Sequence, residues 1–243
     1  LYLAHYAVHS PFMGKKDAVE EASKRPPADG QGNAVYAAML QSVDDSVGRI
    51  LDKLKALHID ENTIVVFTSD NGGAVHIGNP PATANGHLRL GKGYPYEGGL
   101  RVPLLMKAPG AKRGAVCDIP VISHDFYPTL LELVGAPPAS HSIDGVSFVS
   151  ALQGSREVLH DGLFWHYPHY WFRGKVSPYS VAHVGEWKLI RFYEDNHEEL
   201  YNLLEDPSEQ NDLAGARLEE RRMLGGRLDR WLKEVGAQMN PTR

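Results

Sequence analysis

An aspartate and an asparagine follow closely on an apolar run, and their side chains could bind a hard cation. Residues 64–67 read Ile-Val-Val-Phe, which predicts a strand buried on both faces. Asp70 and Asn71 come at the carboxyl end of this strand, where open α/β sheets gather their ligands. The pair Gly72 and Gly73 then lets the backbone turn sharply. Carboxylate and amide oxygens suit calcium and magnesium, although the same residue types are also ordinary turn chemistry.

A second stretch, residues 88–103, is dense in glycine and carries four charged side chains, so it is not expected to be a core element. Its glycines would let the backbone approach a ligand closely. Lys92 offers a compact point charge suited to a tetrahedral oxyanion, whereas the role of Arg89 stays open. Glu97 and Arg101 are expected to brace the loop by an ion pair rather than to contact a substrate.

Together these two blocks resemble the sulfatases of the alkaline-phosphatase superfamily. The likeness is carried by Ser-Asp-Asn-Gly at 69–72 and by Gly-Lys-Gly-x-x-Tyr-Glu-Gly-Gly-Leu-Arg-Val-Pro at 91–103. Residues 85–87, Asn-Gly-His, depart from the run often found at that point of the family. Further matching blocks follow in the family's order and extend the resemblance over nearly the whole chain: 1–12, 36–51, 124–131, 144–147, 185–190 and 199–203.

The resemblance implies an α/β fold, with an alkaline-phosphatase-like sheet flanked by helices, of which this chain would be the C-terminal part. A small C-terminal antiparallel sheet covered by a helix would follow. The implied function is that of a sulfuric ester hydrolase, which cleaves the sulfate ester of a sugar or an aryl alcohol. Such enzymes use a formylglycine nucleophile and a divalent cation, here expected to be Ca²⁺, with Mg²⁺ as the other possibility. Family habit implies a periplasmic or secreted protein.

The resemblance also implies roles for individual residues. Asp70 and Asn71 match the family's metal ligands, and the cation would polarise the sulfate oxygens. Lys92 and His9 match residues that contact the sulfate group, and both would be catalytic by neutralising charge that develops during cleavage. Arg89 is a candidate substrate-binding residue that could touch either the sulfate or the sugar.

Two of the family's features are absent from these 243 residues. One is the nucleophile motif, Cys/Ser-x-Pro-x-Arg, and the other is a first strand with paired aspartates. Cys117 has neither the spacing nor the arginine, and is expected to pack rather than to react. Asp44 and Asp45 lie within a helical pattern and are interpreted as solvated or buttressing helix acids rather than as metal ligands. We therefore expect a fragment whose missing N-terminal half carries the formylglycine, and which is inactive by itself.

An aromatic and histidine-bearing segment, residues 164–173, has a composition suited to stacking on sugar rings. His166 and His169 are therefore candidate substrate-binding residues. The alternative is that the aromatic side chains begin the small sheet and pack against the main domain.

Two other functions stay open. A phosphonate monoester or phosphodiester hydrolase of the same superfamily would share the Asp-Asn metal pair and a similar nucleophile. A non-catalytic sulfatase-like module would bind anionic glycans without turnover. In that case the absence of the nucleophile motif would be a property of the protein.

Apolar runs and breakers predict the elements that position these residues. Strands are expected at 1–8, with His5 buried, and at 64–67, 102–108 and 117–122, and helices at 33–57 and 125–134. Short antiparallel strands at 163–167, 180–184, 187–193 and 198–202 would precede an amphipathic helix at 216–235. We predict two domains: 1–149, the C-terminal part of the α/β catalytic domain, and 150–243, a small α+β subdomain.

Composition agrees with a globular chain, at 42% hydrophobic and 23% charged residues. No apolar run approaches the roughly 20 residues that span a bilayer. The net charge of −5 and the lack of any block of like charge argue against nucleic-acid binding.

Overall fold

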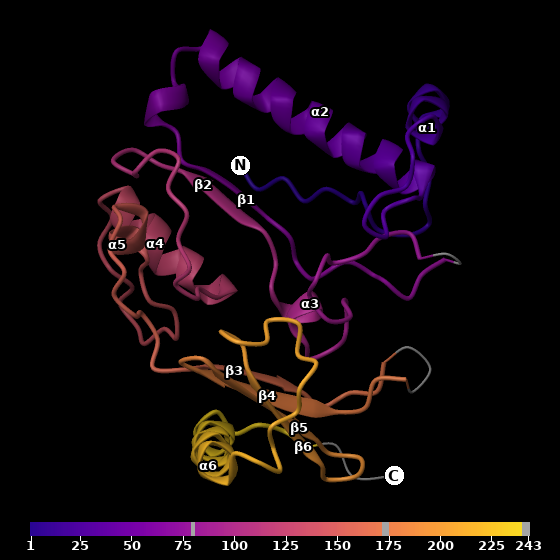
Figure 1. Cartoon of the computed structure of the whole chain (residues 1–243). Coiled ribbons are helices and arrows are strands. Elements are labelled where there is room, and N and C mark those ends of the chain that lie inside the picture. The colour runs from indigo at the N-terminus through magenta and orange to yellow at the C-terminus, as the bar shows by residue number, and fades with distance from the viewer. Residues whose placement is uncertain (79–80, 172–174, 240–243) are drawn as a thin grey trace. The chain divides into compact units, whose positions relative to one another are not determined.

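A computed structural model describes residues 1–78, 81–171 and 175–239 of the chain (Figure 1). The chain divides into two compact units, one of Leu1–Thr63 with Phe67–Leu104 and the other of Ile64–Val66 with Leu105–Arg243. The boundary between 149 and 150 stays a prediction. No helix in the described ranges is long and apolar enough to cross a membrane.

The first unit is built on a long helix, α2 (Ala34–Ala56), which confirms the helix predicted from the sequence. Its N-terminus is capped by Asn33, whose side-chain oxygen accepts a hydrogen bond from the backbone nitrogen of Tyr36 at 2.9 Å. Lys53 and Lys55 lie in its last turn, where positive charge suits the helix dipole. Asp44 and Asp45 are exposed, as interpreted.

A shorter helix, α1 (Lys16–Ser23), packs on α2 in a segment for which no helix or strand was predicted from the sequence (Figure 1). The backbone at Gly14 approaches both helices closely: a Cβ there would lie 2.7 Å from Val19 and 2.8 Å from Ala38. Two short helices complete this unit, the 3₁₀ turn Asp60–Asn62 and α3 (Glu97–Leu100).

Strands β1 (Val65–Thr68) and β2 (Leu104–Lys107) form a two-stranded sheet. The expectation that residues 64–67 are buried on both faces is wrong, because Val66 is 36% exposed and Phe67 41%. Leu105 of β2 is 61% exposed. The described sheet has only these two strands, so neighbouring strands contribute few side chains that could cover these apolar residues.

Two predicted strands do not form in the described structure. Residues 1–8 are irregular, with Leu1 and Tyr2 almost fully exposed, and His5 is exposed rather than buried. Residues 117–122 are also irregular. A strand requires a partner for its backbone hydrogen bonds, and no ladder in the described ranges includes either segment.

The second unit contains a four-stranded antiparallel sheet whose order is that of the sequence. Its strands are β3 (Leu163–Tyr167), β4 (Tyr179–Val184), β5 (Trp187–Phe192) and β6 (Glu198–Asn202). The pairing of Val184 with Trp187 leaves a two-residue turn that begins at Gly185, whose φ is 59°. Glycine adopts this left-handed conformation without strain.

Helix α6 (Leu218–Glu234) covers one face of this sheet (Figure 1). Leu224 and Leu228 of the helix are fully buried against Leu189 and Leu200 of the sheet. The fold class predicted from the sequence, an α/β part followed by a small antiparallel sheet covered by a helix, is confirmed. The remaining helices are the 3₁₀ turn Ser123–Asp125, α4 (Phe126–Leu133) and α5 (Val149–Leu152).

Two buried carboxylates have polar or charged partners within the second unit. Asp125, with no exposed surface, accepts hydrogen bonds from the backbone nitrogens of Ile122 and Val146, each at 2.9 Å, and lies 2.8 Å from His160 Nε2. Lys188 Nζ of β5 lies 2.8 Å from Glu209 Oε1, and both side chains are almost wholly inaccessible to solvent.

Candidate active site

The turn after β1 presents two side-chain oxygens from adjacent residues. Asp70 is exposed, and its carboxylate accepts no hydrogen bond in the part of the chain that the structure describes. The Asn71 side-chain nitrogen donates to the Gly72 carbonyl at 2.9 Å, which orients the amide and leaves Oδ1 available as an acceptor. Carboxylate and amide oxygens are therefore offered side by side.

This turn is held against the glycine-dense loop by contacts that only glycine allows. A Cβ at Gly72 would lie 1.6 Å from the carbonyl oxygen of Gly98, and one at Gly91 would lie 1.9 Å from that of Gly73. The Gly72 backbone nitrogen donates to the Gly99 carbonyl at 3.1 Å. The glycines noted in the sequence thus bring two backbones together.

Lys92 is fixed to the same turn through its backbone. Its nitrogen donates to the Gly73 carbonyl at 3.1 Å, and its side chain is partly exposed. Over residues 1–78, 81–171 and 175–239, the Lys92 ammonium forms no ion pair or hydrogen bond. The structure therefore brings Lys92 and the Asp70–Asn71 pair onto one scaffold within the first unit.

Asn85 joins the two segments and was not recognised from the sequence as a positioning residue. Its Oδ1 accepts from the Gly73 nitrogen at 2.9 Å, and its Nδ2 donates to the carbonyls of Gly73 at 3.2 Å and of Leu90 at 2.6 Å. The sequence signal was the departure of residues 85–87 from the family's usual run. That signal marked the position without indicating which backbone groups the amide would bind.

Arg89 has its guanidinium carbon 3.8 Å from the centroid of the Tyr96 ring, a cation–π contact. Its backbone carbonyl accepts from the Gly98 nitrogen at 3.0 Å. The expected ion pair of Glu97 with Arg101 does not form between these described side chains. Arg101 is exposed, and the two residues are joined instead by a helical backbone hydrogen bond of 2.8 Å.

His9 lies in a turn of its own. Its Nδ1 is 2.8 Å from the Ser10 carbonyl oxygen, and its ring lies 5.5 Å from that of Tyr6. None of its hydrogen bonds or ring contacts with described residues reaches Asp70 or Lys92. The side chain is exposed, and its catalytic role stays a prediction.

The residues present fit part of a cation site. Asp70 and Asn71 offer the oxygen donors that calcium and magnesium prefer, whereas calcium takes about six to eight oxygen ligands. The described ranges contain no group of three or more His, Cys, Asp or Glu side chains arranged to hold a metal. Asp70 and Asn71 would therefore be two ligands of a larger set.

The two aromatic-segment histidines lie in the second unit. His166 has both ring nitrogens engaged, Nδ1 at 2.8 Å from Ser180 Oγ and Nε2 at 2.9 Å from the Gln238 carbonyl. The ring of His169 meets that of Tyr167 edge-on at 5.4 Å. Substrate binding by either histidine stays a prediction. Phe172 and Arg173 of the same segment lie outside the described residues.

Cys117 is exposed, so the expectation that it packs in the interior is wrong. It lies in an irregular segment, and the strand that would have buried it does not form.

Comparison with protein families gives two overlapping matches. The family described as Sulfatase matches residues 1–136, and that described as N-sulphoglucosamine sulphohydrolase, C-terminal, matches residues 86–235. A sulfatase of Formosa agariphila is 38% identical over 233 residues, which covers 87% of this chain and 41% of that protein. Human N-acetylgalactosamine-6-sulfatase is 34% identical over 158 residues, which covers 64% of this chain and 28% of that one. The chain thus spans less than half the length of these relatives.

Solved structures give a consistent picture. The crystal structure of Ps i-CgsB matches with a TM-score of 0.81 and 27% identity, over 95% of this chain and 49% of that chain. The phosphonate monoester hydrolase of Agrobacterium radiobacter matches with a TM-score of 0.64 and 25% identity, over 83% of this chain and 41% of that one.

Proposed function

Because this chain belongs to the sulfatase family, we propose that it serves the hydrolysis of a sulfate ester of a sugar. One observation carries the proposal. The backbone segments that carry Asp70, Asn71 and Lys92 are held together by contacts that tolerate only glycine. Two oxygen donors and an ammonium without an ion pair to described residues are the groups needed to bind a cation and a sulfate together.

Each of the residues present would have its own role in the hydrolysis. Asp70 and Asn71 would hold Ca²⁺ or Mg²⁺ together with further oxygen ligands, and the bound cation would act as a Lewis acid on the sulfate. Lys92 would bind sulfate oxygens and neutralise their charge. His9 would hold a proton near the leaving oxygen. The formylglycine nucleophile is expected from outside these 243 residues, which contain no Cys/Ser-x-Pro-x-Arg motif.

The proposed substrate class is a sulfated sugar, with aryl sulfates as convenient assay substrates. Similar proteins support this choice, since one is a human N-acetylgalactosamine-6-sulfatase and another is a structure in complex with D-glucosamine-2-N,6-O-disulfate. A further similar structure, Ps i-CgsB, was solved with k-i-k-neocarrahexaose. From the family resemblance we also propose a periplasmic or secreted location.

A phosphonate monoester hydrolase is the second candidate, favoured by the structural match to the Agrobacterium enzyme. Both reactions need a cation and a bound tetrahedral anion, so Asp70, Asn71 and Lys92 do not distinguish them. The family matches favour the sulfatase.

The test has two arms. In the first, the chain is titrated with N-acetylglucosamine 6-sulfate in the presence of CaCl₂, and binding is followed by NMR for the wild type, Lys92→Met and Lys55→Met. We expect Lys92→Met to abolish the binding that shifts the resonances of the loop carrying Lys92, and Lys55→Met, which changes an exposed lysine of α2, to leave those shifts intact. Equal binding by all three proteins would sink the proposed role of this site.

In the second arm, the gene product that includes these residues is assayed with 4-nitrophenyl sulfate and 4-nitrophenyl phenylphosphonate. A higher kcat/KM for the sulfate ester is the expected result. A higher value for the phosphonate ester would establish the rival function, and binding without turnover of either ester would establish the glycan-binding module.

A further inference from the structure

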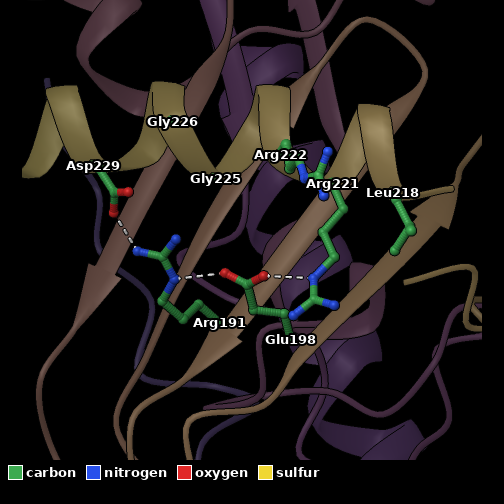
Figure 2. A pocket seen from close by; sticks show the side chains of 8 residues that line it. All are labelled: Arg191, Glu198, Leu218, Arg221, Arg222, Gly225, Gly226 and Asp229. Atoms are coloured by element: carbon green, nitrogen blue, oxygen red, sulfur yellow. Dashed lines mark hydrogen bonds and ion pairs between the residues drawn. The ribbon is translucent and has the colours of Figure 1, made fainter. Parts of the chain in front are cut away.

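A cavity of about 490 Å³ lies where α6 meets β5 and β6, wholly within the second unit (Figure 2). None of its lining residues belongs to the site proposed above. Most of them are charged or are glycines: Arg191, Glu198, Leu218, Arg221, Arg222, Gly225, Gly226 and Asp229.

Glu198 holds two of the arginines in place. Its Oε1 accepts from Arg191 Nε and its Oε2 accepts from Arg221 Nε, both at 2.8 Å. Arg191 also pairs through Nη1 with Asp229 (Figure 2). Three arginines therefore line the cavity together with two carboxylates, which leaves an excess of one positive charge.

Much of the donor capacity of these arginines is unused in the described structure. The Arg221 side chain hydrogen bonds to described residues through Nε alone, so both of its terminal nitrogens remain available. The Arg222 side chain makes no hydrogen bond or ion pair with described residues. Guanidinium groups present planar forks of N–H donors that match the oxygens of sulfate and carboxylate groups.

Two consecutive glycines keep the helix side of the cavity open. Gly225 and Gly226 lie in the interior of α6, where glycine is the least favourable residue except proline. A Cβ at Gly225 would lie 3.3 Å from Arg191 Nη2, so the absence of a side chain makes room for that guanidinium. At Gly226 a Cβ would approach only Arg230, at 4.0 Å, so the glycine there is not required by packing.

Another anion could replace the Asp229 carboxylate as the partner of Arg191. Its side chain is 62% exposed, and exposed ion pairs contribute little to stability. An incoming anion could therefore take its place on Arg191 while Glu198 continues to hold the two guanidinium groups.

From these observations we propose that the cavity binds an oxyanion, the sulfate or carboxylate group of an acidic saccharide, between Arg191, Arg221 and Arg222. Its volume lies in the range of small-ligand sites, and its mainly charged lining suits a hydrated sugar better than an apolar group. The site is additional to the proposed hydrolytic site and would retain an anionic glycan independently of turnover.

The test uses NMR of the arginine Nε–H groups in the full chain, titrated separately with sodium sulfate, glucose 6-sulfate, glucuronate and glucose. We expect shifts of Arg191 and Arg221 with the three anions but not with glucose, and weaker binding at high salt. Arg222→Gln should weaken binding about tenfold, as expected for one charge-assisted contact. Lys233→Gln, which changes an exposed cation of the same helix outside the cavity, should have no effect.

A second pair of variants avoids any loss of structure. Gly226→Glu should place a carboxylate in the cavity and abolish binding while raising the Tm, because glutamate is a better helix former. Gly226→Gln should raise the Tm similarly but reduce binding less.

Unchanged affinity in both Arg222→Gln and Gly226→Glu would show an adventitious ion only and overturn the proposal. Shifts with inorganic sulfate but with neither acidic sugar would overturn the assignment to a saccharide. Shifts confined to the Lys92 loop would place all binding at the hydrolytic site. Because the readout is binding at named arginines, a failure of the proposed hydrolase function would leave this result unaffected.

Discussion

The side chain of Asn85 binds both backbone polar groups of Gly73, accepting from its nitrogen at 2.9 Å and donating to its oxygen at 3.2 Å. A third bond of 2.6 Å reaches the Leu90 carbonyl. One amide therefore sets the separation between the turn that carries Asp70 and the loop that carries Lys92.

Asn85→Ala removes all three hydrogen bonds, so we expect it to lower the free energy of unfolding by about 2 kcal/mol. It should also weaken the binding of N-acetylglucosamine 6-sulfate, because Lys92 loses its fixed position. Chemical denaturation and NMR titration measure the two effects. Asn62→Ala, at an exposed position, is the matched control. Unchanged stability and affinity in Asn85→Ala would remove the proposed positioning role.

Asp70→Ala should abolish calcium binding by the chain, because it removes the only charged ligand of the Asp70–Asn71 pair. Asp70 accepts no hydrogen bond from described residues and is exposed, so its loss should change stability by less than about 0.5 kcal/mol. Isothermal titration with CaCl₂ and thermal unfolding test both statements, with the exposed Asp45→Ala as control. Equal calcium affinity in the wild type and Asp70→Ala would contradict the assignment.

Substitutions of Lys188 and Glu209, which form a buried ion pair, should have strongly coupled effects on the free energy of unfolding. Lys188→Met leaves a buried carboxylate without its cation and should cost about 3–5 kcal/mol, whereas the double variant Lys188→Met/Glu209→Leu should recover much of this loss. The exposed pair Lys24 and Glu21, 2.9 Å apart, provides the comparison, and Lys24→Met should cost at most about 1 kcal/mol. Additive effects of the two buried substitutions would contradict this coupling.

The ionisation of Tyr179 should determine how the free energy of unfolding changes at alkaline pH. Burial, and then the neighbouring Tyr167, raise the pKa of this phenol well above its ordinary value of 10.0. The unfolded chain therefore loses the proton at a lower pH than the native one. Stability is intact below pH 10 and falls as pH rises above it, by up to about 1.4 kcal/mol per pH unit.

Tyr179→Phe should flatten this decline when unfolding is measured between neutral pH and strongly alkaline pH. Tyr127→Phe, which changes a tyrosine that is 50% exposed, should leave the slope unchanged. The same slope in the wild type and Tyr179→Phe would contradict the prediction. Burial also raises the pKa of Tyr193, so a part of the decline should persist.

The sequence predicted best those elements whose pattern is local. Strands β3 and β6 have the predicted bounds, and α2 begins one residue after the predicted start, because its cap Asn33 can be read from the sequence. Residues 1–8 have an apolar pattern but no ladder partner in the described structure, and pattern alone cannot supply one. Helix α1 was missed because its apolar face is short and depends on contact with α2.

At the candidate site, the sequence proposed Asp70, Asn71 and Lys92 through a family resemblance and through their residue types, and their roles stay predictions. It did not reveal why the surrounding glycines are needed. That reason is visible only when Gly72 and Gly98, far apart in the sequence, are seen to touch. The ion pair expected between Glu97 and Arg101 does not form, because α3 ends at Leu100 and the extended backbone of Arg101 breaks the helical spacing that would bring the two side chains together.

The sequential order of strands β3, β4, β5 and β6 has a kinetic consequence. Each strand pairs with the one that follows it in the chain, so the sheet can assemble by successive hairpins with little entropy lost to loop closure. Helix α6 comes next in the sequence and supplies the apolar face that covers them. During synthesis, this sheet and its covering helix could fold as soon as they are made, because no strand pairs with one from a distant part of the sequence.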